Sequence, residues 1–212
     1  MFFALRDPLS YLRCMAPWDL SSIEAFLARA LAQRRPRTSP PAGLQRAAVL
    51  VPVVLSPEPV SLLMTLRTHA VETHKGQVAF PGGVVDSGDG SVVETALRET
   101  EEEIGIPREA VTTLGTLDDL ATPTGFLITP VVGVIRELPK MRVNTAEVAE
   151  AFTVPLSFLA DPGACSREVL VLEGRERLIY RFEFAGKTIW GATALIVRSL
   201  LSVLGDQDEA TA

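Results

Sequence analysis

Apolar residues recur along the chain at two spacings, one typical of strands and one typical of helices. Two dense runs of apolar and β-branched residues, 47–55 and 60–67, flank the turn-forming sequence SPEP and therefore predict a β-hairpin. Further strands are predicted at 76–80, 111–117, 126–135 and 151–156, a second hairpin at 178–190, and helices at 21–35, about 91–104 and 191–205. Because hairpins alternate with helices, this order indicates a mixed α+β fold rather than regular βαβ units.

Composition and charge narrow the class of protein. The chain has 212 residues, of which 47% are hydrophobic, which fits one sizeable domain with extensions. A formal net charge of −6 argues against a nucleic-acid partner and against a basic membrane-binding patch. No apolar run approaches the ~20 residues that span a bilayer. The two cysteines, Cys14 and Cys165, form no CxxC motif, so we expect a cytoplasmic protein without a zinc cluster.

The helix predicted at about 91–104 has well-marked ends. Ser91 and Glu94 have the spacing of a capping box, and Gly105 stands where a helix-terminating glycine belongs. The sequence before it, PGGVVDSGDG, predicts a long glycine-rich loop.

Four glutamates crowd the end of this helix, in the stretch RETEEEIGI. On a helical wheel, Glu99, Glu102 and Glu103 fall within about 100° of one another, whereas Glu101 lies apart. Such neighbours repel by a few tenths of a kcal/mol per pair, and the helix dipole also disfavours anions at this end. A bound divalent cation such as Mg²⁺ would remove both penalties. The alternative is a solvated acidic face, which is the usual role of a charge run.

The whole stretch GGVVDSGDGSVVETALRETEEEIGI resembles the Nudix box, GX5EX7REUXEEXGU, in which U is a bulky apolar residue. Its second half matches closely, although Thr100 occupies the usual apolar position. The first half departs from the pattern, because Asp89 replaces glutamate and eight residues rather than seven separate it from Arg98. We therefore do not count Asp89 as a primary metal ligand.

The preceding segment, LLMTLRTHAVETHKGQVAFPGG, is similar to the one found before the box in the coenzyme A pyrophosphatase branch of Nudix hydrolases. That branch commonly has an aspartate and a box one residue longer. One departure is Glu72, at a position where the branch often has arginine. The matching residues are Arg67, His74, Gly76, Gln77, Phe80, Pro81, Gly82 and Gly83.

The resemblance implies a Nudix fold, an α/β/α sandwich around a mixed sheet. We expect this domain at 46–205, after a helical extension at 1–45 and before an acidic tail at 206–212. Three roles stay open for the extension: covering the core, forming a homodimer contact or capping the pocket. The implied reaction is hydrolysis, with Mg²⁺ or Mn²⁺, of coenzyme A or acyl-CoA to 3′,5′-ADP and (acyl-)4′-phosphopantetheine. The alternatives are an enzyme for ADP-ribose or another nucleoside diphosphate derivative, and a catalytically silent nucleotide sensor.

The predicted metal ligands are the carbonyl of Gly83 and the carboxylates of Glu99, Glu102 and Glu103. Arg98 has a fork of donors suited to orienting these acids. The resemblance also implies a carboxylate that deprotonates the attacking water. That base is the glutamate beside the box arginine, Glu99, or a residue on a later loop, where Glu147 is the first candidate and Glu150 the second. Glu103 is expected to act in catalysis through the charge of the metal that it holds. For both loop residues, an ordinary surface glutamate is the alternative.

The predicted substrate-binding residues are Arg67, His74, Gln77 and Phe126. Arg67 ends a predicted strand and could grip the pyrophosphate or the 3′-phosphate, or it could be an exposed structural arginine. His74 could contact a phosphate or be a structural histidine, and Phe126 could line the substrate pocket or belong to the core.

Overall fold

The protein is described here by a computed structural model that covers residues 20–38, 43–68, 76–172 and 175–205. Its centre is an eight-stranded sheet with the path β3-β2-β1-β7-β5, to which β4, β6 and β8 add by pairing with β1, β7 and β2. The strands are β1 Gln45–Val54, β2 Ser61–Arg67, β3 Val78–Ala79, β4 Gly82–Val84, β5 Thr112–Thr116, β6 Leu120–Ala121, β7 Phe126–Ile135 and β8 Val148–Pro155.

The sheet is mixed, as predicted. β1 and β2 form the expected antiparallel hairpin, whereas β1 runs parallel to β7 along its whole length, from the pair Gln45–Phe126 to the pair Val54–Ile135. Successive residues of β1 point to opposite faces of the sheet, so an almost wholly apolar strand contributes to the core on both faces. Val51 and Val53 belong to the core on one face, and Leu50 belongs to the core on the other.

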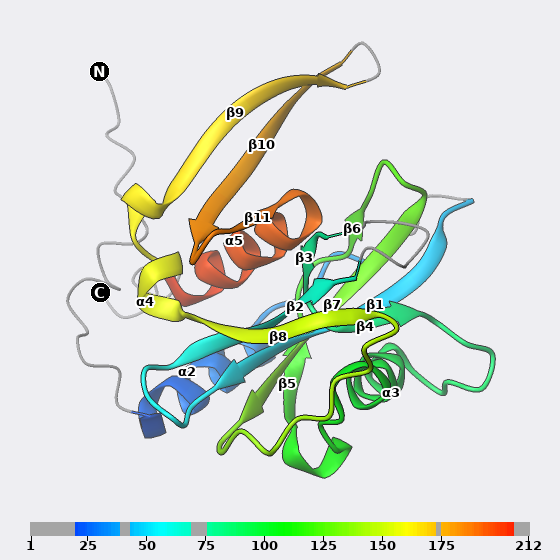
Figure 1. The fold of residues 1–212 in the computed structure, drawn as a ribbon, viewed down its shortest axis with the longest axis vertical. Helices are drawn as coiled ribbons and strands as arrows, with labels where there is room; N and C mark the ends of the chain where they lie inside the picture. Colours follow the sequence, from blue (N-terminus) through cyan, green and yellow to red (C-terminus); the bar gives the residue numbers. More distant parts are fainter. Residues whose placement is uncertain (1–19, 39–42, 69–75, 173–174, 206–212) are drawn as a thin grey trace.

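Helices cover both faces of the sheet (Figure 1). α3, Val92–Ile104, packs on one face through Ala96 and Ile104. α2, Leu20–Gln33, and α5, Gly191–Gly205, share the core on the opposite face. The remaining helical segments are α4 Leu156–Leu159 and the 3-10 turns η1 Arg108–Ala110 and η2 Pro162–Ala164. The arrangement is therefore the expected α/β/α sandwich. None of the helices in the described part of the chain is long and apolar enough to cross a membrane.

A second sheet of three strands projects from this body (Figure 1). It consists of β9 Cys165–Leu172, β10 Arg175–Phe184 and β11 Lys187–Trp190. The β10–β11 hairpin was predicted, but β9 was not.

The segment that leads into α3 is shorter and more ordered than the predicted loop. β3 covers only Val78–Ala79, and Gly82–Val84 form β4, which pairs antiparallel with β1. A Cβ at Gly82 would lie only 2.3 Å from the carbonyl oxygen of Ala48, so only glycine allows this close approach. The short strand places Gly82 and Gly83 beside α3 and leaves only 85–91 as the connection to the helix.

Candidate active site

α3 has the predicted ends, with one difference in its cap. The Ser91 side chain accepts a hydrogen bond from the backbone N–H of Glu94 at 3.2 Å, and Gly105 ends the helix with φ 70°. The Glu94 carboxylate, however, accepts from the N–H of Gly90 at 2.7 Å, so the capping box is only half formed as predicted. Thr100 fits its buried position because its hydroxyl donates to the carbonyl of Ala96 at 2.6 Å. The two helix ends and the buried Thr100 set the orientation of α3, and therefore the directions in which its glutamates point.

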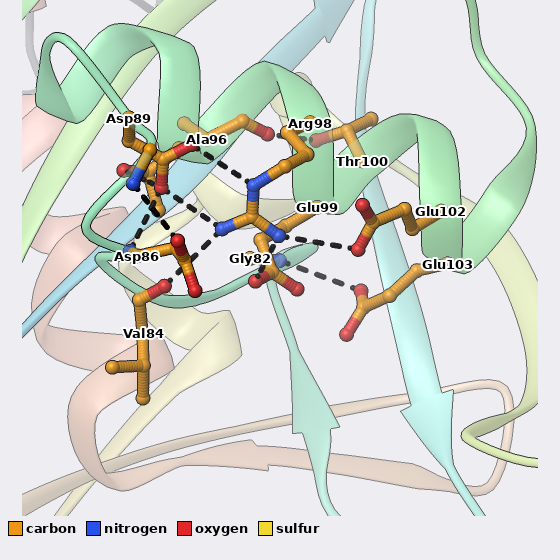
Figure 2. Close-up of polar contacts among 12 residues, drawn as sticks. Gly82, Val84, Asp86, Asp89, Ala96, Arg98, Glu99, Thr100, Glu102 and Glu103 are labelled. Atoms are coloured by element: carbon orange, nitrogen blue, oxygen red, sulfur yellow. Dashed lines mark hydrogen bonds and ion pairs between the residues drawn. The ribbon is translucent and has the colours of Figure 1, made fainter.

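Arg98 links the loop to the glutamates of α3 (Figure 2). Its Nε and Nη2 atoms donate to the two oxygens of Asp89 at 3.0 and 2.9 Å, and Nη2 also reaches the carbonyl of Val84 at 3.3 Å. Its Nη1 atom donates to Glu99 at 2.8 Å and to Glu102 at 3.2 Å. The guanidinium is thus shared between an anchoring carboxylate and two predicted metal ligands.

Asp89 is the anchor of this arrangement, a role that was not predicted for it. Its carboxylate also accepts hydrogen bonds from the backbone N–H of Asp86 at 2.9 Å and from the hydroxyl of Thr95 at 2.8 Å. The hydrogen bonds from Arg98 hold the pKa of Asp89 well below its ordinary value. The described contacts of Asp89 therefore tie the loop, through Asp86, to Thr95 and Arg98 of α3.

Glu103 is the most deeply buried of the acids, with only 3% of its surface exposed. Its partners are distant: the N–H of Gly82 lies at 3.4 Å and Arg67 Nη1 at 3.8 Å. Burial therefore dominates and raises the pKa of Glu103 to about 7, against the lowering effect of Arg67. Burial also raises the pKa of Glu99, although the hydrogen bond from Arg98 opposes the shift. Two carboxylates are held where a positive charge would stabilise them.

Gly83 lies directly against the carboxylate of Glu99. A Cβ at this position would be 2.4 Å from Glu99 Cδ and 2.6 Å from each oxygen, so the absent side chain is what makes room for the acid. Carboxylate and carbonyl oxygens are the donors that hard divalent cations prefer, so the chemistry of these groups, the Gly83 cradle, fits such a cation.

The carboxylates of the three glutamates are not gathered around one point in this structure. Glu99 and Glu102 are held by Arg98, whereas Glu103 turns toward Gly82. Among the described residues, no three His, Cys, Asp or Glu side chains are placed to hold a metal ion in this arrangement. The metal-ligand assignment therefore stays a prediction, supported by burial and by the Gly83 cradle.

Glu147 lies in the turn that leads into β8. The carbonyl of Glu147 accepts from the N–H of Thr68 at 2.9 Å, and its carboxylate accepts from the side-chain amide of Asn144 at 3.3 Å. Its charge contributes to the raised pKa of both Glu99 and Glu103, after burial as the main cause, so it lies in their electrostatic neighbourhood. The second candidate base, Glu150, pairs instead with Lys187 at 3.1 Å.

The predicted substrate-binding residues lie in different places relative to the glutamates of α3. Arg67 lies beside Glu103, and its backbone N–H donates to the carbonyl of Gln77 at 3.0 Å. Phe126 is half-buried at the start of β7, and none of its described contacts reaches the glutamates. His74 lies outside the described residues. Their roles toward a substrate stay predictions.

Comparison with known proteins shows the family to which the chain is similar. The NUDIX domain family matches residues 44–164. The chain is 41% identical to the Nudix hydrolase NudL of Photorhabdus laumondii over 156 residues, which are 74% of this chain and 83% of that protein. It is 39% identical to NudL of Pectobacterium atrosepticum over 189 residues, 88% of this chain and 96% of that protein.

The chain is also similar to solved structures. One is RenU, a Nudix hydrolase of M. smegmatis, which is 27% identical with a TM-score of 0.46. The match covers 56% of this chain and 75% of RenU. Another is the C. elegans Ap4A hydrolase binary complex, with 20% identity, a TM-score of 0.46, and coverage of 52% and 80%.

The chain belongs to the Nudix family. It is a Nudix hydrolase, an enzyme that acts on a small-molecule substrate containing a pyrophosphate, and enzymes of this family generally use divalent metal ions. This confirms the resemblance seen in the glutamate-rich helix, the α+β fold and the expectation of an enzyme.

Proposed function

We propose that this enzyme hydrolyses the pyrophosphate bond of coenzyme A or acyl-CoA, with Mg²⁺ or Mn²⁺, to 3′,5′-ADP and (acyl-)4′-phosphopantetheine. The observation that carries the proposal is the pairing of Arg67 with Glu103 at 3.8 Å. Arg67 belongs to the segment that resembles the coenzyme A branch, and Glu103 belongs to the Nudix box. Their proximity supports one site in which the first recognises phosphate and the second helps to hold the metal. We expect this activity in the cytoplasm.

The chemistry of such a bond explains the composition of the site. A pyrophosphate carries negative oxygens that repel an attacking water, and a bound divalent cation neutralises them and acidifies the water. Glu99, Glu102, Glu103 and the Gly83 carbonyl would hold the cation. Rigid placement on one helix means that little reorganisation is needed during the reaction.

The remaining residues are proposed to orient the metal ligands, to accept a proton and to bind phosphate. Arg98 fixes the orientation of Glu99 and Glu102 through its hydrogen bonds to both. Glu147 is the proposed base that accepts the proton of the attacking water, because it is a loop carboxylate whose charge acts on both Glu99 and Glu103. Arg67 would contact the pyrophosphate or the 3′-phosphate of the substrate.

Two other functions remain as alternatives. Pro123, in the turn between β6 and β7, lies about as far past the box as the proline of many Nudix enzymes that hydrolyse ADP-ribose, so ADP-ribose or another nucleoside diphosphate derivative is the second candidate substrate. A silent nucleotide sensor is the third. The intact set of Glu99, Glu102 and Glu103 argues against a sensor, because a domain that only binds has no need of three repelling acids.

A panel of substrates tests the proposal. Coenzyme A, acetyl-CoA, ADP-ribose, NADH and a diadenosine polyphosphate should be offered side by side with Mg²⁺ or Mn²⁺, and the products separated by chromatography. We expect the highest kcat/KM for the coenzyme A substrates, and a lower value for dephospho-CoA if Arg67 contacts the 3′-phosphate. A preference for ADP-ribose would keep the metal chemistry and reject the substrate assignment, whereas no turnover of any compound despite metal binding would favour the sensor.

A further inference from the structure

The loop between β7 and β8 contains Asn144, which contacts both the metal-site helix α3 and the proposed base Glu147. We propose that Asn144 is a positioning residue, which fixes the carboxylate of Glu147 relative to the end of α3 and its glutamates. This inference rests on the proposed function, because it gives Glu147 a part in hydrolysis. It assigns a role to a residue that neither the Nudix box nor the segment before it includes.

The first contact of Asn144 is with the end of α3. Its backbone N–H donates to the carbonyl of Glu103 at 2.8 Å, and the nearby N–H of Arg142 donates to the carbonyl of Ile104 at 2.9 Å. The last carbonyls of a helix have no partner within the helix, so these bonds satisfy groups that would otherwise be unpaired. They also fix the loop at the residue that carries the buried carboxylate of the site.

The second set of contacts is with Glu147 itself. The carbonyl of Asn144 accepts from the N–H of Glu147 at 3.1 Å and from that of Val148 at 2.9 Å, which closes the turn that leads into β8. The side-chain amide donates to Glu147 Oε1 at 3.3 Å. One residue therefore holds both the backbone and the carboxylate of the proposed base.

The orientation of the Asn144 amide follows from its neighbours. The N–H of Ala146 can only donate, and it points at Asn144 Oδ1 at a distance of 3.2 Å. The other end of the amide, facing Glu147, must then be the NH₂ group. The side chain thus has two separate tasks: its oxygen forms the turn, and its nitrogen binds the carboxylate.

Glu147 is held on its other side by the sheet. Its carbonyl bonds to Thr68, and the next residue, Val148, pairs with Arg67 at the end of β2. Because Arg67 in turn faces Glu103, Asn144 lies where the loop, the helix end and the strand end meet. A change there alters the placement of Glu147 relative to Glu103 without removing either carboxylate.

The substitution Asn144→Asp separates the two tasks. Aspartate has nearly the same shape and keeps an oxygen to accept from Ala146, but it loses the donor to Glu147 and places a second negative charge beside it. Thr145→Asp is the matched control, because Thr145 is exposed and the change adds the same charge to the same loop. Thermal melting of both variants checks that the loop and the domain remain folded.

We expect Asn144→Asp to lower kcat by about tenfold or more, with KM within about threefold and Mn²⁺ binding, followed by paramagnetic resonance, close to that of the unsubstituted enzyme. Thr145→Asp should stay within about twofold in all three. In the Glu147→Gln background, Asn144→Asp should have no further effect, since its role is exerted through that carboxylate.

Three results would overturn the inference: kcat of Asn144→Asp within twofold of the unsubstituted enzyme, an equal loss in the Glu147→Gln background, or a Glu147→Gln variant with unchanged kcat. The third result would also remove Glu147 as the base. None of the three would remove the proposed hydrolysis of coenzyme A, which is tested separately by the substrates that the enzyme accepts and by its dependence on Glu103.

Discussion

Gly83 and the carboxylate of Glu99 lie so close together that a Cβ on Gly83 would sit 2.4 Å from Glu99 Cδ. Gly83 does not have a positive φ, so its backbone conformation would accept alanine without strain. Glycine is therefore needed at this position because a side chain would occupy the space of the Glu99 carboxylate. Gly83 belongs to the first half of the Nudix box and Glu99 to the second, so the two halves of the box meet at this contact.

The substitution Gly83→Ala should consequently act through Glu99. We expect the methyl group to displace the carboxylate, lowering Mn²⁺ affinity and kcat/KM at least about tenfold, while the melting temperature changes little. Gly88→Ala is the matched control, because a Cβ there would meet Asp86 only at an ordinary 3.5 Å. Titration with Mn²⁺ and steady-state kinetics measure both effects, and equal behaviour of the two variants would reject the Gly83 cradle.

The raised pKa of Glu103 predicts how stability depends on pH in the metal-free protein. Because its pKa is about 7 when folded and near 4.5 when unfolded, the folded state binds more protons between these values. The stabilising contribution of the proton is complete below pH 4.5 and is lost as pH rises through 7.

Glu103→Gln should remove this dependence. In EDTA at pH 8, we expect the variant to exceed the unsubstituted protein in free energy of unfolding by up to roughly 3 kcal/mol, a difference that shrinks toward pH 5. Denaturant unfolding at several pH values measures it. A difference between the two proteins that does not change with pH would show that Glu103 is not the titrating group.

The bond between Asp89 and Arg98 predicts an indirect effect on metal binding. Asp89 engages two donors of the guanidinium and leaves Nη1 for Glu99 and Glu102. In Asp89→Asn the guanidinium should turn further toward these two acids and compete with the cation. We expect Mn²⁺ affinity to fall about tenfold. Asp86→Asn, an exposed change in the same loop, should leave affinity unaltered, and similar losses in both variants would contradict this mechanism.

Glu101 provides a test of the helix register. It is about half exposed and pairs with Arg108 at 3.4 Å, away from the other acids. Exposed pairs of this kind contribute about 0–1 kcal/mol to stability. Glu101→Gln should therefore keep kcat/KM within about twofold, whereas Glu102→Gln, which removes the same charge one residue along, should weaken Mn²⁺ binding. A large loss from Glu101→Gln would mean that the ligands are wrongly assigned.

The elements that could be predicted from the sequence are those with strong local signals. The β1–β2 hairpin follows from two apolar runs around a turn, and α3 follows from Ser91 and Gly105 at its ends. β4 gives no such signal, because Gly82 and Gly83 have low strand propensity and pair with β1 only through a close approach to Ala48. The parallel pairing of β1 with β7 joins segments about 80 residues apart, which no local pattern specifies.

The candidate site also contains some residues that could be predicted from local patterns and others that could not. The positions of Glu99, Glu102 and Glu103 follow from helical periodicity and from the Nudix box. The parts played by Asp89 and Asn144 depend on how loops close onto α3, so spacing along the chain does not give them. An asparagine that begins a turn, as Asn144 does, is nevertheless a recognisable signal, and it could have drawn attention to the loop before β8.

The central claim is metal-dependent hydrolysis of coenzyme A that requires Glu103. The most direct test incubates coenzyme A with the enzyme and with Glu103→Gln, in Mg²⁺ and in EDTA, and measures 3′,5′-ADP by chromatography. We expect 3′,5′-ADP and 4′-phosphopantetheine from the unsubstituted enzyme in Mg²⁺ alone, with the other three samples reduced by about a thousandfold or more. Intact coenzyme A in every sample, or product formation that survives EDTA or the substitution, would contradict the claim.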